Sequence, residues 1–157
     1  MTALGQVLIA MSVLAGGIIY GTDVFSAIVL RPALALVDDQ TLVSTMGRVH
    51  DFGDRRLRVP GVAGIGTAIA GTAVVAWAGH LGAAIAGTIA VVALAGWLII
   101  YVRIGAPINA RLTAASQRGE LPPDARLLQQ RWDSVITARS GLQMLAILAL
   151  CTVLITS

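Results

Sequence analysis

Two side chains in this sequence have the type and position to carry acid–base chemistry, and Asp23 is the first. It interrupts an apolar stretch over residues 3–30 and precedes Arg31 by eight positions, roughly 12 Å along a helix. A charge at membrane depth costs about 2.5–3.5 kcal/mol, so Asp23 should face a bundle interior and find a partner there. The alternative is a helix that leaves the membrane near Thr22, with Asp23 at the interface.

His50 is the second such side chain, and it could act as a general base or a metal ligand. The alternative is a partly exposed histidine on an amphipathic helix, with Asp54 one turn further on. The other histidine, His80, lies in a distant turn beside Trp77, so the two histidines should not share a haem. Neither belongs to a metal-binding motif, and the sequence carries no nucleotide-binding fingerprint, so we expect no metal and no cofactor.

Arginines at the ends of the apolar stretches could bind an anion. Such arginines usually fix topology and contact lipid headgroups, but some could turn inward and bind an acidic group or a phenolate. Arg139 is the best candidate because Gln143 lies one turn further along the same predicted helix face, which also carries Trp132. Arg103, and Tyr20 on the helix face of Asp23, are further candidates for contact with a substrate.

The elements that must position these residues are apolar helices. Hydrophobic residues make up 57% of the 157 residues and charged residues only 12%, against about 25% charged in a soluble domain. This composition excludes a soluble, disordered or fibrous chain, and the single cysteine excludes an internal disulfide. A bilayer core needs about 20 apolar residues per helix. Four stretches approach that length, namely 3–30, 59–79, 81–102 and 138–156. We therefore predict one all-α domain over residues 1–157, an integral membrane four-helix bundle.

The placement of the arginines predicts the topology. All 11 lysine and arginine residues are arginines. Each lies between the first and second stretches or between the third stretch and Ser140, with Arg139 at the very start of the fourth. The positive-inside rule puts both of these segments in the cytoplasm and both termini outside, so the termini are extracytoplasmic. We expect a multi-pass protein of a bacterial-type plasma membrane. Its partners would be the lipid bilayer and an apolar small molecule, with no nucleic acid, and a homo-oligomer is left open.

Both cytoplasmic segments are predicted to contain amphipathic helices. In the first, Arg31–Pro32 should end the first helix, and an aspartate at 38–39 should cap a new one. The apolar face of this new helix is expected to hold Leu42, Met46 and Val49. In the second segment, Pro107 should start or kink a continuation of the third helix that ends at Gly119. Asp124 should cap the helix that enters the fourth stretch.

Small residues and charge pairs give three weaker expectations. Gly17 and Gly21 form a GxxxG pair, which we interpret as tight packing within the bundle and not as a dimer motif. Asp54 and Arg58 are four apart on one helix face, and an exposed pair of this kind contributes only about 0.3–0.5 kcal/mol. Core or interface packing is expected of Trp97 and Tyr101.

Three short patches then suggest a family. They are a glycine-rich run at 16–21 followed by 31–34, the pair Pro107 and Asn109, and the pair Trp132 and Arg139. On these patches the chain resembles the anthrone-oxygenase-like family, small four-helix membrane proteins of mostly unknown function. The resemblance covers nearly the whole chain and implies the same fold.

For some family members the resemblance implies oxidation of an anthrone, a tricyclic phenol, to an anthraquinone by molecular oxygen without a cofactor. On this chain Asn109 and Arg139 would then hold an oxyanion, and Trp132 would stack on the ring. His50 or Asp23 would act as the base that makes the phenolate.

The chain departs from the family in residues 133–138, where many members have a histidine and this chain has none. The alternative to an enzyme is a noncatalytic protein, that is, a small-solute channel, a transporter, or an accessory or structural subunit. Asp23 would then be a proton or cation site. A closed pocket ringed by Asp23, Asn109, Trp132 and Arg139 would favour the enzyme, and a continuous water path would favour transport.

Overall fold

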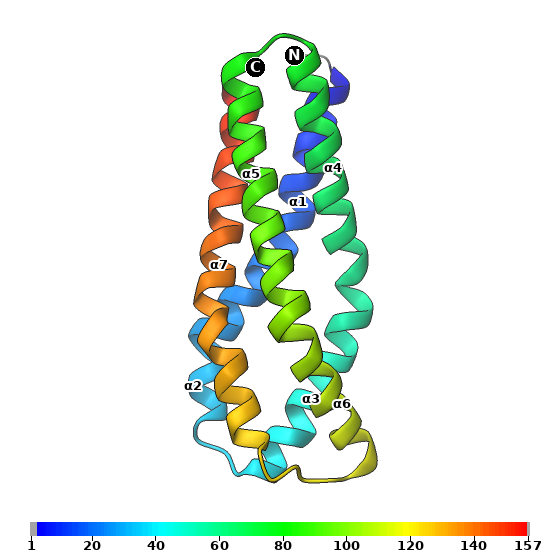
Figure 1. Ribbon diagram of the computed structural model, residues 1–157, viewed down its shortest axis with the longest axis vertical. Helices are drawn as coiled ribbons and strands as arrows, with labels where there is room; N and C mark the ends of the chain where they lie inside the picture. Colours follow the sequence, from blue (N-terminus) through cyan, green and yellow to red (C-terminus); the bar gives the residue numbers. More distant parts are fainter. Residues whose placement is uncertain (1–2, 157) are drawn as a thin grey trace.

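The computed structural model describes residues 3–156, and all regular secondary structure in this range is helical. The helices form one elongated bundle (Figure 1). In chain order the elements are α1 (Ala3–Phe25), the π-helical turn η1 (Ser26–Leu30), α2 (Arg31–Leu34), α3 (Asp39–Arg56), α4 (Arg58–Trp77), α5 (Leu81–Ile100), the π-helical turn η2 (Tyr101–Gly105), α6 (Ala106–Arg118) and α7 (Ala125–Thr156).

Four helical segments are long and apolar enough to cross a membrane. They are Ala3–Leu34, Arg58–Trp77, Leu81–Arg118 and Ala125–Thr156. The prediction of an all-helical bundle with four candidate spans is therefore confirmed. The two chain ends and the α4–α5 turn lie at one end of the bundle, and α2, α3 and α6 lie at the other (Figure 1). We call the end formed by α2, α3 and α6 the loop end.

The half of the bundle nearer the chain termini is packed through small residues. A Cβ atom on Gly71 would lie 2.7 Å from Ile9 Cδ1, and one on Gly87 would lie 2.5 Å from Thr72 Oγ1, so these glycines permit close helix contact. The prediction for Gly17 and Gly21 is wrong. A Cβ atom at either position would meet nothing within 4 Å, because both residues face away from the neighbouring helices.

Two helices continue through a proline at the loop end. The predicted helix end at Arg31–Pro32 is wrong, because the helix runs on through η1 and α2 to Leu34. The π-helical turn gives the Arg31 N–H a bond to the Ser26 carbonyl, and Pro32 falls in a first turn, where its missing N–H costs little. The turn η2 precedes Pro107 in the same way, and this helix continues to Gly119 as predicted, where φ is +67°.

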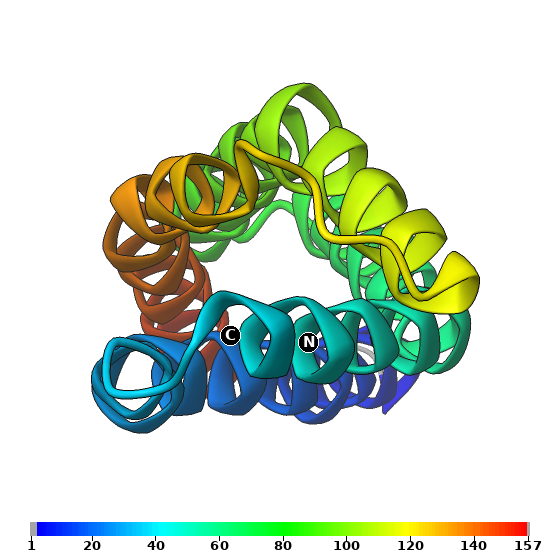
Figure 2. The same ribbon diagram turned by 90° about the horizontal axis from the view of Figure 1, so that it is seen from below.

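The predicted amphipathic helix of the first loop is α3. Asp38 caps it, since Oδ1 of this residue accepts a 2.7 Å hydrogen bond from the Thr41 N–H. Leu42 and Met46 are buried as expected, but Val49 is exposed and the next residue, His50, is buried instead. Helix α3 lies beside α6 across the loop end (Figure 2).

Helix α7 starts directly after Asp124, as predicted, and continues into the fourth candidate span. Four residues of one face are buried, which confirms the predicted face: Trp132, Ile136, Arg139 and Gln143. The buried candidate residues come from four helices: Asp23 from α1, His50 from α3, Asn109 from α6, and Trp132, Arg139 and Gln143 from α7.

Candidate active site

Asp23 lies inside the bundle with only 3% of its surface exposed. Its carboxylate accepts hydrogen bonds from Trp97 Nε1 at 3.1 Å, from Arg139 Nη2 at 2.9 Å and from Gln143 Nε2 at 3.0 Å. The expectation of a buried acid with a partner is confirmed. The ion pair with Arg139 and the two neutral donors offset the cost of burying the charge.

Arg139 is buried within a cage of aromatic rings. Its guanidinium carbon lies 5.7 Å from the centre of the Trp97 ring and 5.6 Å from the centres of the Tyr101 and Trp132 rings. Gly105 leaves room for it, since a Cβ atom there would come within 3.4 Å of Arg139 Nη1. Asp23 and the three rings therefore fix the cation in place. The Nε atom of Arg139 is buried and has no hydrogen-bond partner.

A chain of hydrogen bonds joins four polar side chains beside this cage. Trp132 Nε1 donates to Asn109 Oδ1 at 3.0 Å, and Asn109 Nδ2 donates to Asp54 Oδ1 at 2.9 Å. The Tyr101 hydroxyl donates to the same Asp54 oxygen at 2.8 Å. Asp54 thus contacts one residue of η2 and one of α6. It does not form the ion pair with Arg58 that the sequence suggested.

His50 is buried beside Trp132, with 4% of its surface exposed and the two ring centres 5.5 Å apart. The partly exposed alternative for this histidine is therefore excluded. Burial lowers the pKa of His50 from 6.5 to about 4, and the positive charge of Arg139 acts in the same direction. The side chain is thus neutral near pH 7, and its buried Nε2 has no hydrogen-bond partner.

A cavity of about 350 Å³ lies among these residues. Its lining includes five of the predicted site residues: Asp23, His50, Asn109, Trp132 and Arg139. This volume falls within the usual range of small-molecule sites. The cavity combines apolar walls with a few polar groups, which is the ordinary make-up of such a site.

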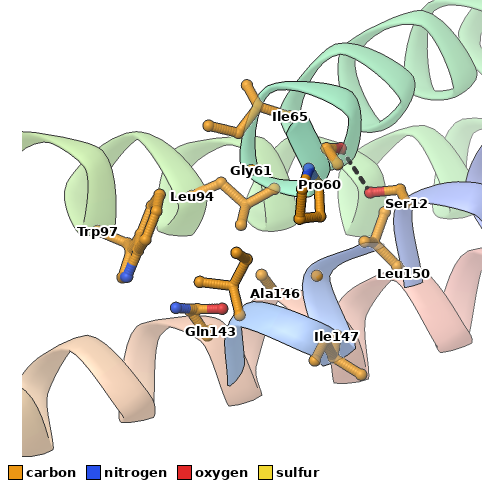
Figure 3. Close-up of a pocket in the computed structure, with 13 residues that line it drawn as sticks. Ser12, Pro60, Gly61, Ile65, Leu94, Trp97, Gln143, Ala146, Ile147 and Leu150 are labelled. Carbon is orange, nitrogen blue, oxygen red and sulfur yellow. Dashed lines mark hydrogen bonds between the residues drawn. The ribbon is translucent and has the colours of Figure 1, made fainter. Parts of the chain in front are cut away.

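Three other predicted contact residues do not line this cavity. Tyr20 is half-buried on α1, and Arg103 is exposed on η2. Gln143 reaches the site only through its bond to Asp23. It also lines a small second cavity of about 20 Å³ toward the chain termini, with Trp97 and Ser12 (Figure 3). That space is large enough for about one water molecule.

The sequence interpretation missed three side chains of the site. Asp54 was expected only in a surface ion pair, and packing alone was expected of Trp97 and Tyr101. A signal was present in the spacing, because Asp54 lies four residues after His50 and so shares its helix face. Trp97 bonds to Asp23, 74 residues away, and Tyr101 bonds to Asp54, 47 residues away. No local sequence pattern reveals contacts at such separations.

The described residues contain no group of three or more histidine, cysteine or acidic side chains placed to hold a metal ion. Comparison of the chain with protein-family models, with characterised proteins and with solved structures finds no match. The resemblance to the anthrone-oxygenase-like family therefore stays a prediction, and the geometry of the site is the basis for a functional proposal.

Proposed function

We propose that this protein binds a planar, apolar aromatic hydroxy compound in the cavity and oxidises it with molecular oxygen, without a cofactor. One observation carries the proposal: a buried, neutral His50 with an unpaired Nε2 borders a cavity of about 350 Å³ with aromatic walls. A neutral imidazole has a free lone pair on one ring nitrogen and can accept a proton there. We place the site in a multi-pass protein of a bacterial-type plasma membrane, with the loop end in the cytoplasm.

The walls of the cavity suit a flat, apolar ligand. The rings of Trp97 and Tyr101 are stacked within 7° of parallel, with their centres 5.8 Å apart, and Trp132 lines another part of the wall. Aromatic ligands pack well against such rings. Arg139 supplies the positive charge that would hold a phenolate oxygen, and the second N–H of the Asn109 amide remains for the same oxygen.

The proposed chemistry can be written for an anthrone. His50 takes one methylene hydrogen as a proton, which leaves a phenolate whose charge is delocalised over the rings and held by Arg139. Molecular oxygen then adds at the former methylene carbon. One oxygen atom becomes the new carbonyl, and the other leaves in water with the two methylene hydrogens. The four-electron oxidation of the carbon is thus balanced by the reduction of one oxygen molecule.

The alternative is a noncatalytic channel, transporter or accessory subunit in which Asp23 binds a proton or cation. The environment of Asp23 favours the enzyme, because three donors, one of them the Arg139 cation, already occupy its oxygens. A carboxylate held in this way is suited to position Arg139 and poorly suited to exchange an ion. For the same reason His50, and not Asp23, is the base in this proposal.

Oxygen uptake by the purified protein with anthrone tests the enzyme directly. The His50→Gln variant should lose about 100-fold in rate, as expected for removal of a general base. Arg139→Ala should also remove the activity. His80→Gln is the matched control, because His80 lies in the α4–α5 turn at the opposite end of the bundle. Uptake by the wild type that is no faster than that of His50→Gln would exclude the proposed function.

A further inference from the structure

The seam between α4 and α5 is closed near the chain termini. A Cβ atom on Gly87 would come within 2.5 Å of Thr72 Oγ1, so the two helices touch there. Val75, Ala83 and Ala90 belong to the core cluster of this half of the bundle and fill the space beside the contact. In this half of the bundle, therefore, no ligand could pass between the two helices.

The same seam is open nearer the loop end. Ile65 lies about two turns before Thr72 on the same side of α4, and Leu98 lies about three turns after Gly87 on the same side of α5. Both Ile65 and Leu98 line the large cavity. The cavity therefore reaches the facing sides of α4 and α5 here, although Ile65 also packs against the core cluster.

Two rim residues of this opening are apolar and lie within the candidate spans, whereas the exposed lining of the cavity also includes Thr22 on α1, Val49 on α3 and Arg58 at the start of α4. Val62 lines the cavity from α4 yet is 68% exposed, and Leu98 lines it from α5 yet is 38% exposed. A side chain that borders a cavity and is also exposed marks its mouth. Both residues belong to segments long and apolar enough to cross a membrane. Where these segments cross a bilayer, the part of the mouth between Val62 and Leu98 faces hydrocarbon.

We propose that the cavity opens sideways to the lipid between α4 and α5, and that its ligand is an amphiphile that enters from the membrane. The polar side chains His50, Asn109 and Arg139 stand on α3, α6 and α7, and not on the two helices that flank the mouth. The ligand therefore places its hydroxyl or carbonyl group against these residues and its apolar part toward Val62 and Leu98. The lateral opening does not depend on the proposed function. Only the hydroxyl or carbonyl group assigned to the ligand rests on it.

Chemical labelling of a thiol inside the cavity tests the route. Ser26 lines the cavity and is buried, so Ser26→Cys in a Cys151→Ala background introduces a single thiol there. The protein is reconstituted in phosphatidylcholine vesicles and treated with pyrene maleimide, which partitions into the bilayer. A parallel sample receives a charged methanethiosulfonate, which stays in water. We expect labelling by the maleimide and none by the charged reagent.

A larger side chain at the mouth should block this labelling. Gly61 lines the cavity, and a Cβ atom there would meet nothing within 4 Å, so Gly61→Leu can be accommodated and should slow the maleimide about tenfold by restricting access. Gly66→Leu is the matched control, because Gly66 has the same free space on the same helix but lines neither cavity. A second pair, Leu98→Trp against the exposed Ile99→Trp, gives the same contrast from α5 if Gly61→Leu does not fold.

The outcomes separate the route from the function. Equal maleimide rates in Gly61→Leu and Gly66→Leu, or rapid labelling by the charged reagent, would overturn the lateral opening and leave the proposed oxidation standing. A thiol that neither reagent reaches would mean a closed cavity, which overturns the opening and the proposed function together. Slowing by Gly61→Leu with no effect on oxygen uptake would support the opening but contradict the oxidation.

Discussion

At the scale of single residues, the ion pair of Asp23 and Arg139 explains how a chain with so few charges can keep two of them inside its bundle. The pair is the only salt bridge between described residues in which both side chains are almost fully buried. Such a pair adds little net stability, because desolvation offsets the attraction between the charges. Its value lies in position, since Asp23 fixes the cation among the aromatic rings of the cavity wall.

Removal of one partner should therefore be costly. Asp23→Asn keeps the shape of the side chain but leaves the Arg139 charge uncompensated, and we expect a loss of about 3–5 kcal/mol in the free energy of unfolding. Asp51→Asn is the control, because its partner Arg55 is largely exposed and this pair within one helix should contribute no more than about 0.5 kcal/mol. Unfolding in mixed micelles measures both losses, and equal losses in the two variants would contradict the role given to Asp23.

His50 should make the stability depend on pH. Burial holds its pKa at about 4 in the folded protein, against 6.5 in the unfolded chain. Between these values the unfolded chain binds a proton that the folded protein does not, so stability falls as the pH falls from about 6.5 to about 4. The loss attributable to His50 should approach about 3 kcal/mol. It should disappear in His50→Gln and persist in His80→Gln, and unchanged pH profiles in His50→Gln would refute it.

At the scale of elements, the site depends on how closely α3 approaches α6. Thr113 Oγ1 donates to the Gly47 carbonyl at 3.1 Å, and Ser116 Oγ donates to the Ser44 carbonyl at 3.3 Å. This contact sets the height and rotation of α3, which carries His50 and Asp54. The hydrogen bonds from α6 hydroxyls to α3 carbonyls thus help to hold His50 and Asp54 at the cavity.

The close approach predicts a sharp contrast between two glycines of α3. A Cβ atom on Gly47 would lie 2.5 Å from the Leu112 carbonyl oxygen, a backbone atom that cannot move alone, so Gly47→Ala should destabilise the protein by about 1–3 kcal/mol. A Cβ atom on Gly53 would meet nothing within 4 Å, and Gly53→Ala should be neutral or stabilising by up to about 1 kcal/mol. Thermal unfolding of the two variants compares them directly, and equal effects would mean that α3 and α6 are not tightly packed.

The elements also show how far the sequence could predict this structure. Long apolar stretches and local capping signals fix where helices lie, so the candidate spans, the start of α3 at Asp38 and the end of α6 at Gly119 were predictable. The passage through Arg31–Pro32 was not, because the π-helical turn before it leaves no local sequence signal that we could identify. In the site, buried polar residues were predictable one at a time, whereas the bonds of Asp54 depend on helices distant in sequence.

At the scale of the whole molecule, the direction in which the chain runs through the bundle matches the distribution of its arginines. The chain ends and the α4–α5 turn share one end of the bundle, and the segments that contain every arginine form or adjoin the other. If all four candidate spans cross a membrane, the two ends of the bundle lie on opposite sides of it. If the loop end is cytoplasmic, the polar wall of the cavity and its proposed mouth lie in the inner half of the bilayer.

Thiol labelling in cells should establish this orientation. In a Cys151→Ala background, Ala78→Cys introduces an exposed thiol in the α4–α5 turn, and Glu120→Cys introduces one after α6. A membrane-impermeant maleimide should label the first thiol in intact spheroplasts and the second only after lysis, because the positive-inside rule predicts that the arginine-rich segments are cytoplasmic. The reverse pattern would move the cavity to the outer leaflet. A ligand made inside the cell would then have to cross the bilayer before reaching His50.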